Sequence, residues 1–142
     1  MKKIIATLLM LLSASSFAVT KEQCKIANEM LELDGELILK IKDTLLTPDF
    51  DKSTTEEWTD DFLKDYITVI MMHSLQKDNS EPVLLAQTMT VKVFAFSQLA
   101  LNYVEDKSDH NKKLVKDMIA NMGEISRRLN SLCHGYKPKS KG

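Results

Sequence analysis

Residues 81–105 read EPVLLAQTMTVKVFAFSQLALNYVE, and this stretch decides the fold. Between Pro82 and Val104 the only charged residue is Lys92, so a helix formed by this stretch is apolar on nearly every side. A single strand of this length is implausible, and Lys92 at the midpoint disfavours a membrane span. We therefore expect the central helix of an all-α bundle, with residues 83–104 covered by the other helices or by a second copy in a homodimer.

Two amphipathic segments precede this stretch. The first is expected to run as a helix from about Thr20 to Leu46, and Pro48 in TPDFDKST ends it. The second begins at a capping box of Ser53 and Glu56 and ends near residue 76. Their apolar stripes are Cys24, Ala27, Met30, Leu31, Ile38, Ile41 and Leu45 in the first, and Trp58, Phe62, Tyr66, Val69 and Ile70 in the second.

Turn and capping residues predict the remaining boundaries. KDNSEP separates the second helix from the third, with Ser80 as the N-cap and Pro82 in the first turn. Ser108 or Asp109 caps a fourth helix, whose stripe is Leu114, Met118, Met122, Ile125, Leu129 and Leu132. The pattern predicts a single-domain four-helix bundle of up-down-up-down topology over residues 19–134.

The first 18 residues, MKKIIATLLMLLSASSFA, have the pattern of a cleaved secretory signal. Lys2 and Lys3 form a positive start, and the apolar run that follows is too short to span a bilayer. Ser16 and Ala18 are the small residues that signal peptidase requires before its cleavage site. We therefore expect a periplasmic protein that has no membrane anchor after cleavage.

Export favours a disulfide between the two cysteines, Cys24 and Cys133, because the periplasm oxidises thiols. In an up-down-up-down bundle the start of the first helix and the end of the last lie at the same end. The bond would therefore join the ends of these two helices. His134 then begins a solvated tail after the bundle, Gly135 stops the helix, and residues 135–142 are expected to form a basic, disordered tail.

Familiar catalytic and metal-binding patterns do not occur in the sequence. No glutamate stands three residues before His73, His110 or His134, as di-metal bundles require, and there is no G-x-S-x-G or phosphate-binding glycine loop. Met71, Met72 and His73 resemble a copper-binding pattern, but the pattern occurs once and its methionines point in different directions on a helix. We therefore expect no enzyme, metal or cofactor, and copper binding at this tripeptide stays open.

Acidic residues gather before and within the start of the second helix. Seven acids and two lysines stand between positions 49 and 65, which exceeds what a helix dipole needs in its first turn. Aromatic residues among carboxylates favour an anchor for a basic protein partner, and a plain solvated face is the alternative. The expected partner-binding residues are Asp49, Phe50, Asp51, Glu57, Trp58, Asp60 and Asp61. Nucleic acid is not an expected partner outside the cytoplasm.

A small exported helical chain, closed by Cys24 and Cys133 and carrying an acidic, aromatic segment around Phe50, resembles the periplasmic immunity proteins of type VI secretion effectors. The resemblance lies in the architecture of the chain. It implies that the protein binds a cell-wall-degrading toxin and occludes its active cleft, often as a dimer. A periplasmic chaperone or stress adaptor is the alternative, and a metal- or haem-binding bundle is a further one.

Overall fold

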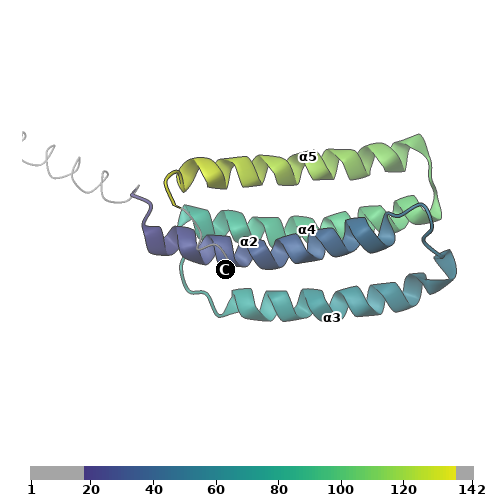
Figure 1. Ribbon diagram of the computed structural model, residues 1–142, viewed down its shortest axis with the longest axis horizontal. Helices are drawn as coiled ribbons and strands as arrows, with labels where there is room; N and C mark the ends of the chain where they lie inside the picture. The colour runs from purple at the N-terminus through teal and green to yellow at the C-terminus, as the bar shows by residue number, and fades with distance from the viewer. Residues whose placement is uncertain (1–17, 137–142) are drawn as a thin grey trace, which may run out of the picture.

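The computed structural model describes residues 18–136 (Figure 1). Within that range, four α-helices and no strands form an up-down-up-down bundle, which confirms the predicted fold class. The predicted signal, apart from Ala18, and the tail at residues 137–142 lie outside the described residues. The helices are α2 (Lys21–Lys40), α3 (Thr55–Ser74), α4 (Glu81–Glu105) and α5 (Asp109–Leu132).

Helix α4 is the central helix, as its sequence predicts. It packs against both α2 and α5, and Figure 1 shows α3 and α5 on opposite sides of the pair that α2 and α4 form. Its buried apolar residues are Pro82, Val83, Ala86, Met89, Val93, Phe96, Ala100 and Val104. Within the described chain, α4 alone is long and apolar enough to cross a membrane by length and composition, a property that buried core helices share.

The limits of three helices agree with the sequence. A capping box between Thr20 and Gln23 begins α2, which continues into a π-helical turn, η1 (Ile41–Leu45), and so reaches the predicted end. The hydroxyl of Ser108 accepts a hydrogen bond from the main-chain N–H of Asn111 and caps α5. Ser80 occupies the predicted N-cap of α4, although its hydroxyl makes no capping hydrogen bond.

The predicted capping box of Ser53 and Glu56 is wrong. Ser53 lies in a 3-10 turn, η2 (Lys52–Thr54), and α3 begins only after it, at Thr55. Asp51 Oδ1 accepts from the main-chain N–H of Ser53 at 2.9 Å and from its hydroxyl at 2.8 Å. A carboxylate two residues earlier therefore takes the main-chain N–H of Ser53, which would have donated to Glu56 in the capping box.

The predicted disulfide joins Cys24 in the first turn of α2 to Cys133, directly after α5. Their Cα atoms lie 5.7 Å apart, within the usual range for a disulfide. The bond closes the end of the bundle at which α2 begins and α5 ends. Gly135 follows with φ of 92°, a conformation that favours glycine and fits its predicted role as the helix stop.

An aromatic row along α3 forms one side of the core. Trp58 stacks on Phe62 with ring centroids 5.1 Å apart, Phe62 lies 6.0 Å from Tyr66, and Tyr66 lies 5.2 Å from Phe94 of α4. Ile70, predicted on this stripe, is instead 42% exposed. The buried face of α3 passes from Tyr66 to Val69, three residues on, and not to Ile70, and it consists of Trp58, Phe62, Tyr66, Val69 and His73.

Candidate functional site

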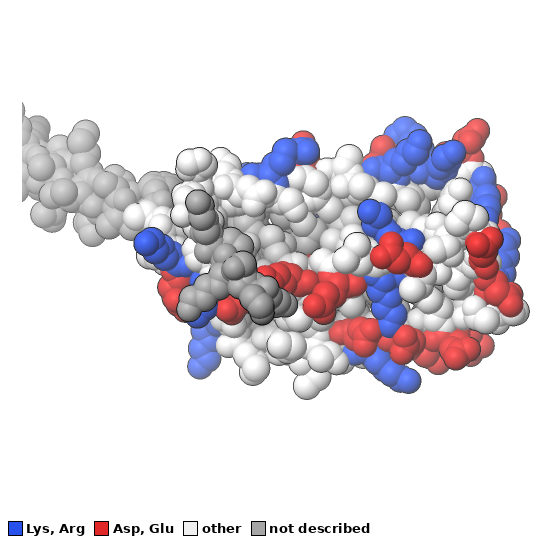
Figure 2. All heavy atoms as spheres, viewed as in Figure 1, with Lys and Arg blue, Asp and Glu red and all other residues white. Residues whose placement is uncertain are grey.

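An open hollow of about 750 Å³ lies over the first half of α3. Four carboxylates line it, and Lys64 is the one cation among its lining residues. Figure 2 shows acidic side chains gathered along this part of the surface. We call this surface the acidic hollow, and its lining residues are Ser53, Thr54, Glu56, Glu57, Trp58, Asp60, Asp61 and Lys64.

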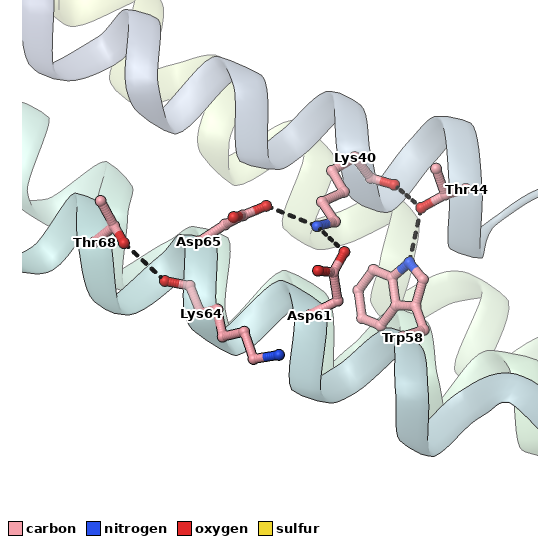
Figure 3. A network of polar contacts seen from close by, with 7 residues as sticks. All are labelled: Lys40, Thr44, Trp58, Asp61, Lys64, Asp65 and Thr68. Carbon is pink, nitrogen blue, oxygen red and sulfur yellow. Dashed lines mark hydrogen bonds and ion pairs between the residues drawn. The ribbon is translucent and has the colours of Figure 1, made fainter.

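Trp58 forms a fixed wall of the acidic hollow. Its ring is largely buried and stacks nearly parallel on Phe62, with an angle of 9° between the planes. Its Nε1 donates a hydrogen bond of 2.7 Å to the hydroxyl of Thr44, which in turn donates to the main-chain carbonyl of Lys40 (Figure 3). The ring therefore lines the hollow without projecting from it as a free anchor.

Lys40 links the hollow to α2. Its Nζ lies 2.6 Å from Asp61 Oδ2 and 2.7 Å from Asp65 Oδ2, as Figure 3 shows. Burial lowers the pKa of Lys40, but the hydrogen bonds and charges of the two carboxylates outweigh it, and the pKa rises. The hydrogen bond from Lys40, followed by its charge, lowers the pKa of Asp61. One carboxylate of the hollow is therefore held ionised and in place.

Three other carboxylates of the hollow are available to a partner. Glu56, Glu57 and Asp60 are exposed, and the ion pairs of the described residues do not include them. The side chain of Lys64 points away from Lys40 in Figure 3. Exposed carboxylates on a concave wall complement lysine or arginine side chains of a protein surface.

The structure brings together only part of the predicted binding residues. Those that line the acidic hollow are Glu57, Trp58, Asp60 and Asp61. Asp49, Phe50 and Asp51 stand in the preceding loop and do not line it. Phe50 is half-buried against the core, and Asp51 caps η2, where the hydrogen bonds from Ser53 lower its pKa. Asp49 is exposed.

Sequence reasoning did not assign to the site four residues that line the hollow, nor Lys40, which binds Asp61; the four are Ser53, Thr54, Glu56 and Lys64. Glu56 lies beside Glu57 and was assigned only to the capping box that the structure lacks. Lys40 lies 21 positions before Asp61, and no sequence spacing indicates that the two meet.

The tripeptide Met71, Met72 and His73 does not converge on one point. Both methionines are exposed, whereas His73 is buried, and its Nδ1 lies 2.9 Å from the hydroxyl oxygen of Thr90. Three ligands that face different environments cannot share one copper ion in this arrangement. Within residues 18–136, no group of three or more histidine, cysteine, aspartate or glutamate residues is placed to hold a metal ion.

A second notable surface is apolar. Tyr66 and Phe94 are in ring contact, so α3 and α4 lie side by side at this point. Both helices leave large apolar side chains exposed, and we call these residues the apolar face: Ile67, Ile70, Met71, Leu75, Leu84, Val91 and Phe94. Met72 is also exposed, but it lies on the other side of α3, beside Leu33 and Lys40 of α2. Of the segment expected to form a homodimer, residues 83–104, the structure thus leaves three large apolar side chains exposed: Leu84, Val91 and Phe94.

Comparisons with known proteins give no relative of this chain. Protein-family models, curated proteins and solved structures were each searched, and none matches.

Proposed function

We propose that this chain is a periplasmic immunity protein, which binds a cell-wall-degrading antibacterial toxin without catalysis and occludes its active cleft. The acidic hollow is the observation that carries the proposal. Its exposed carboxylates surround a wall that Trp58 and Lys40 hold in place. A surface that is ordered before binding loses less conformational entropy when a partner docks, so more of the contact energy becomes affinity.

The architecture supports the proposed compartment. A disulfide persists in the oxidising periplasm and is rare in the cytosol, where thiols are kept reduced. The bond between Cys24 and Cys133 links the two ends of the helical region, so the bundle does not depend on a large core alone. The signal pattern at residues 1–18 supports export to the same compartment.

The charges of the hollow also suit the kinetics that an immunity protein requires. A toxin must be captured before it reaches its substrate, and complementary charge raises the rate of encounter. We therefore expect the partner to present lysine or arginine side chains around its cleft. Binding should weaken as the salt concentration rises, because ions screen exposed charges.

The first experiment identifies the partner and then tests the surface. The oxidised protein without its signal captures partners from periplasmic and secreted fractions, and mass spectrometry finds whether one hydrolase binds stoichiometrically. The affinity for that hydrolase, and the inhibition of its cell-wall hydrolysis, are then measured with Glu57→Lys/Asp60→Lys. Reversing both charges should weaken binding by roughly 100-fold or more and abolish inhibition.

The matched control is Glu29→Lys/Glu105→Lys. It changes the net charge by the same amount at two exposed acids that lie outside the hollow and outside the ion pairs of the described residues. Equal loss of binding in both double variants would show a general charge effect and remove the hollow from the proposal. Unchanged binding in both double variants would also remove the hollow from the proposal.

The apolar face favours a second candidate function, a periplasmic chaperone or stress adaptor. Exposed apolar side chains on two neighbouring helices favour a surface that binds other proteins, and a methionine such as Met71 adapts to many shapes. The test follows the light scattering of a client enzyme that aggregates on heating, in the absence of reductant, with and without the oxidised protein. If the wild type suppresses aggregation of the client and Met71→Ser/Leu75→Ser does not, this function is favoured over immunity.

The apolar face also supports a homodimer through residues 83–104. Val91 is the most exposed of the large apolar side chains of α4. A charge at this position would be solvated in a monomer and buried in such a dimer. Multi-angle light scattering should therefore show a dimer for the wild type and a monomer for Val91→Glu, and a monomeric wild type would contradict the proposal.

A further inference from the structure

A buried polar cluster joins α2, α3 and α4 inside the core. Asp34 has no exposed surface, and His73 and Thr90 are 6% and 5% exposed. The Thr90 hydroxyl oxygen lies 2.8 Å and 3.0 Å from the two carboxyl oxygens of Asp34 and 2.9 Å from His73 Nδ1. The hydroxyl of Tyr66 donates to the main-chain carbonyl of Thr90 at 3.3 Å.

Within residues 18–136, no ion pair balances a charge on Asp34. The ion pairs of the described residues do not include it. The titratable groups that face it are His73 and Tyr66, both from α3, while α4 contributes the hydroxyl of Thr90. From α5, no hydrogen bond or ion pair of the described residues reaches it. An ionised Asp34 would therefore have Thr90 as its one hydrogen-bond partner.

The single proton of the Thr90 hydroxyl restricts where the other protons lie. If Thr90 donates to His73 Nδ1, then Asp34 must carry a proton and donate it to Thr90, because two oxygen lone pairs would otherwise face each other. If Thr90 donates instead to Asp34, or to the main-chain carbonyl of Ala86 at 3.2 Å, then Nδ1 must carry a proton. The same heavy-atom positions thus hold either a neutral pair or an ionised Asp34 beside a histidine protonated at Nδ1, which is neutral or charged according to whether Nε2 also carries a proton.

The surroundings of His73 favour the neutral pair. Burial lowers the pKa of His73, and the main chain of Met30 opposes this shift, which identifies it as a hydrogen-bond acceptor near the ring. No regular hydrogen bond among the described residues reaches Nε2 of this ring. A proton on Nε2 directed at that acceptor would leave Nδ1 free to accept from Thr90. Burial also raises the pKa of Asp34 to about 7, although the hydrogen bond from Thr90 lowers it.

We propose that Asp34, Thr90 and His73 form a buried pH switch, in which folding moves one proton from the imidazolium of His73 to the carboxylate of Asp34. In the unfolded chain at mildly acid pH, histidine is charged and aspartate is ionised. In the folded protein the N–H bond of the imidazolium is broken and an O–H bond on Asp34 is formed, so both groups are neutral. Loss of that proton above neutral pH leaves a buried carboxylate and loosens α3 from α2 and α4.

The sign of each effect follows from linkage. The pKa of Asp34 is higher in the folded state than its ordinary value of 3.8, so its contribution to stability falls as pH rises from there toward about 7. The pKa of His73 is lower than its ordinary value of 6.5, so its contribution falls as pH decreases through 6.5. Just below pH 6.5 the two effects cancel, because the folded and unfolded states each hold one proton.

Single variants separate the two effects. Asp34→Asn mimics the protonated carboxyl, since its amide can donate to Thr90, and it leaves only the histidine to titrate. His73→Asn keeps an acceptor near the position of Nδ1 and leaves only the aspartate. Just below pH 6.5, raising the pH by one unit should increase the folding equilibrium constant of Asp34→Asn by up to about tenfold. The same change in pH should decrease that of His73→Asn by a similar factor.

Urea unfolding of the oxidised protein across about pH 5 to about pH 8 measures these slopes.

Trp58, the only tryptophan, lies on α3, so quenching of its fluorescence by acrylamide reports how α3 packs. Quenching should increase above neutral pH in the wild type and stay constant in Asp34→Asn. The proposal would be overturned if stability changed with pH in the same direction in both variants. It would also be overturned if the quenching of Trp58 still increased above neutral pH in Asp34→Asn. NMR titration of the Asp34 carboxyl carbon checks it independently of stability, and ionisation near the ordinary pKa would also overturn it.

Discussion

Replacing both cysteines, as Cys24→Ala/Cys133→Ala, should remove a large part of the stability of the protein. The disulfide joins residues 109 positions apart. In the chain-entropy model, closing a loop of this length costs the unfolded chain about 16 cal/mol/K, which is about 4.8 kcal/mol at room temperature. A domain of this size has about 5–15 kcal/mol of stability in total. Alanine is the appropriate substitute, because Cys24 is buried and a serine hydroxyl would lack a partner.

Urea unfolding, followed by circular dichroism, measures the loss. For a slope near 1.5 kcal/mol per molar urea, the midpoint should fall by about 3 M. The slope itself should increase, because an unfolded chain without the cross-link exposes more surface. Reduced wild-type protein is the control and should behave like the alanine variant, which shows that the bond and not the packing of the sulfur atoms is responsible.

A loss below about 1 kcal/mol would refute this reasoning. It would mean that the unfolded chain keeps its two ends together without the bond. A loss with an unchanged slope would instead place the effect in the folded state, at the contacts of Ala27, Val83 and Leu129 near the bond.

Three further predictions test the core and the site. Thr90→Val should lower the free energy of unfolding by about 2–4 kcal/mol, because Asp34 and His73 lose their shared partner in the core, and Thr90→Ser should cost much less, as urea unfolding would show. Phe96→Ala should cost about 3–5 kcal/mol, because Phe96 is fully buried in the central helix, and a loss below about 1 kcal/mol would mean that α4 is not central. Lys40→Met should lower the melting temperature by no more than a few degrees, since its carboxylate partners are exposed, while the pKa of Asp61, followed by NMR, rises toward its ordinary value.

Much of the fold was predictable because local signals and the apolar pattern agree. The limits of α4 follow from Ser80 and Pro82 at its start, and its central place follows from the near absence of charge along it. The prediction failed where two local signals compete. Asp51 and Glu56 both offer a carboxylate to Ser53, and the nearer one prevails.

For the candidate site, the sequence could predict which segment is acidic but not how its side chains are arranged. Acidic residues in one segment indicated a charged surface, and the lining of the hollow does come from that segment, at positions 53–64. The contacts that hold its wall in place come from the packing of α2 on α3. Lys40 reaches Asp61 and Asp65 across that contact, and Trp58 turns inward to the hydroxyl of Thr44. Such tertiary contacts leave no spacing in the sequence, so the wall of the hollow could not be foreseen.

The buried cluster did leave a signal in the sequence. Asp34 stands in phase with the apolar stripe of α2, and its buried neighbours at helical spacing are Ala27, Met30, Leu37 and Ile41. His73 stands in phase with the aromatic row of α3. A polar residue on an apolar stripe at the correct spacing indicates a partner in the core, because an unpaired buried polar group is costly.

This cluster also accounts for how the bundle selects one arrangement. A helix that is apolar on nearly every side, as α4 is, gains nearly equal hydrophobic energy in several rotations and in registers one turn apart. Thr90 removes this freedom, since its hydroxyl meets Asp34 and His73 in one rotation and one register only. A slip of one turn would leave Asp34 and His73 buried without partners. The polar residues in the core thus cost some stability and specify which face of α4 each neighbouring helix contacts.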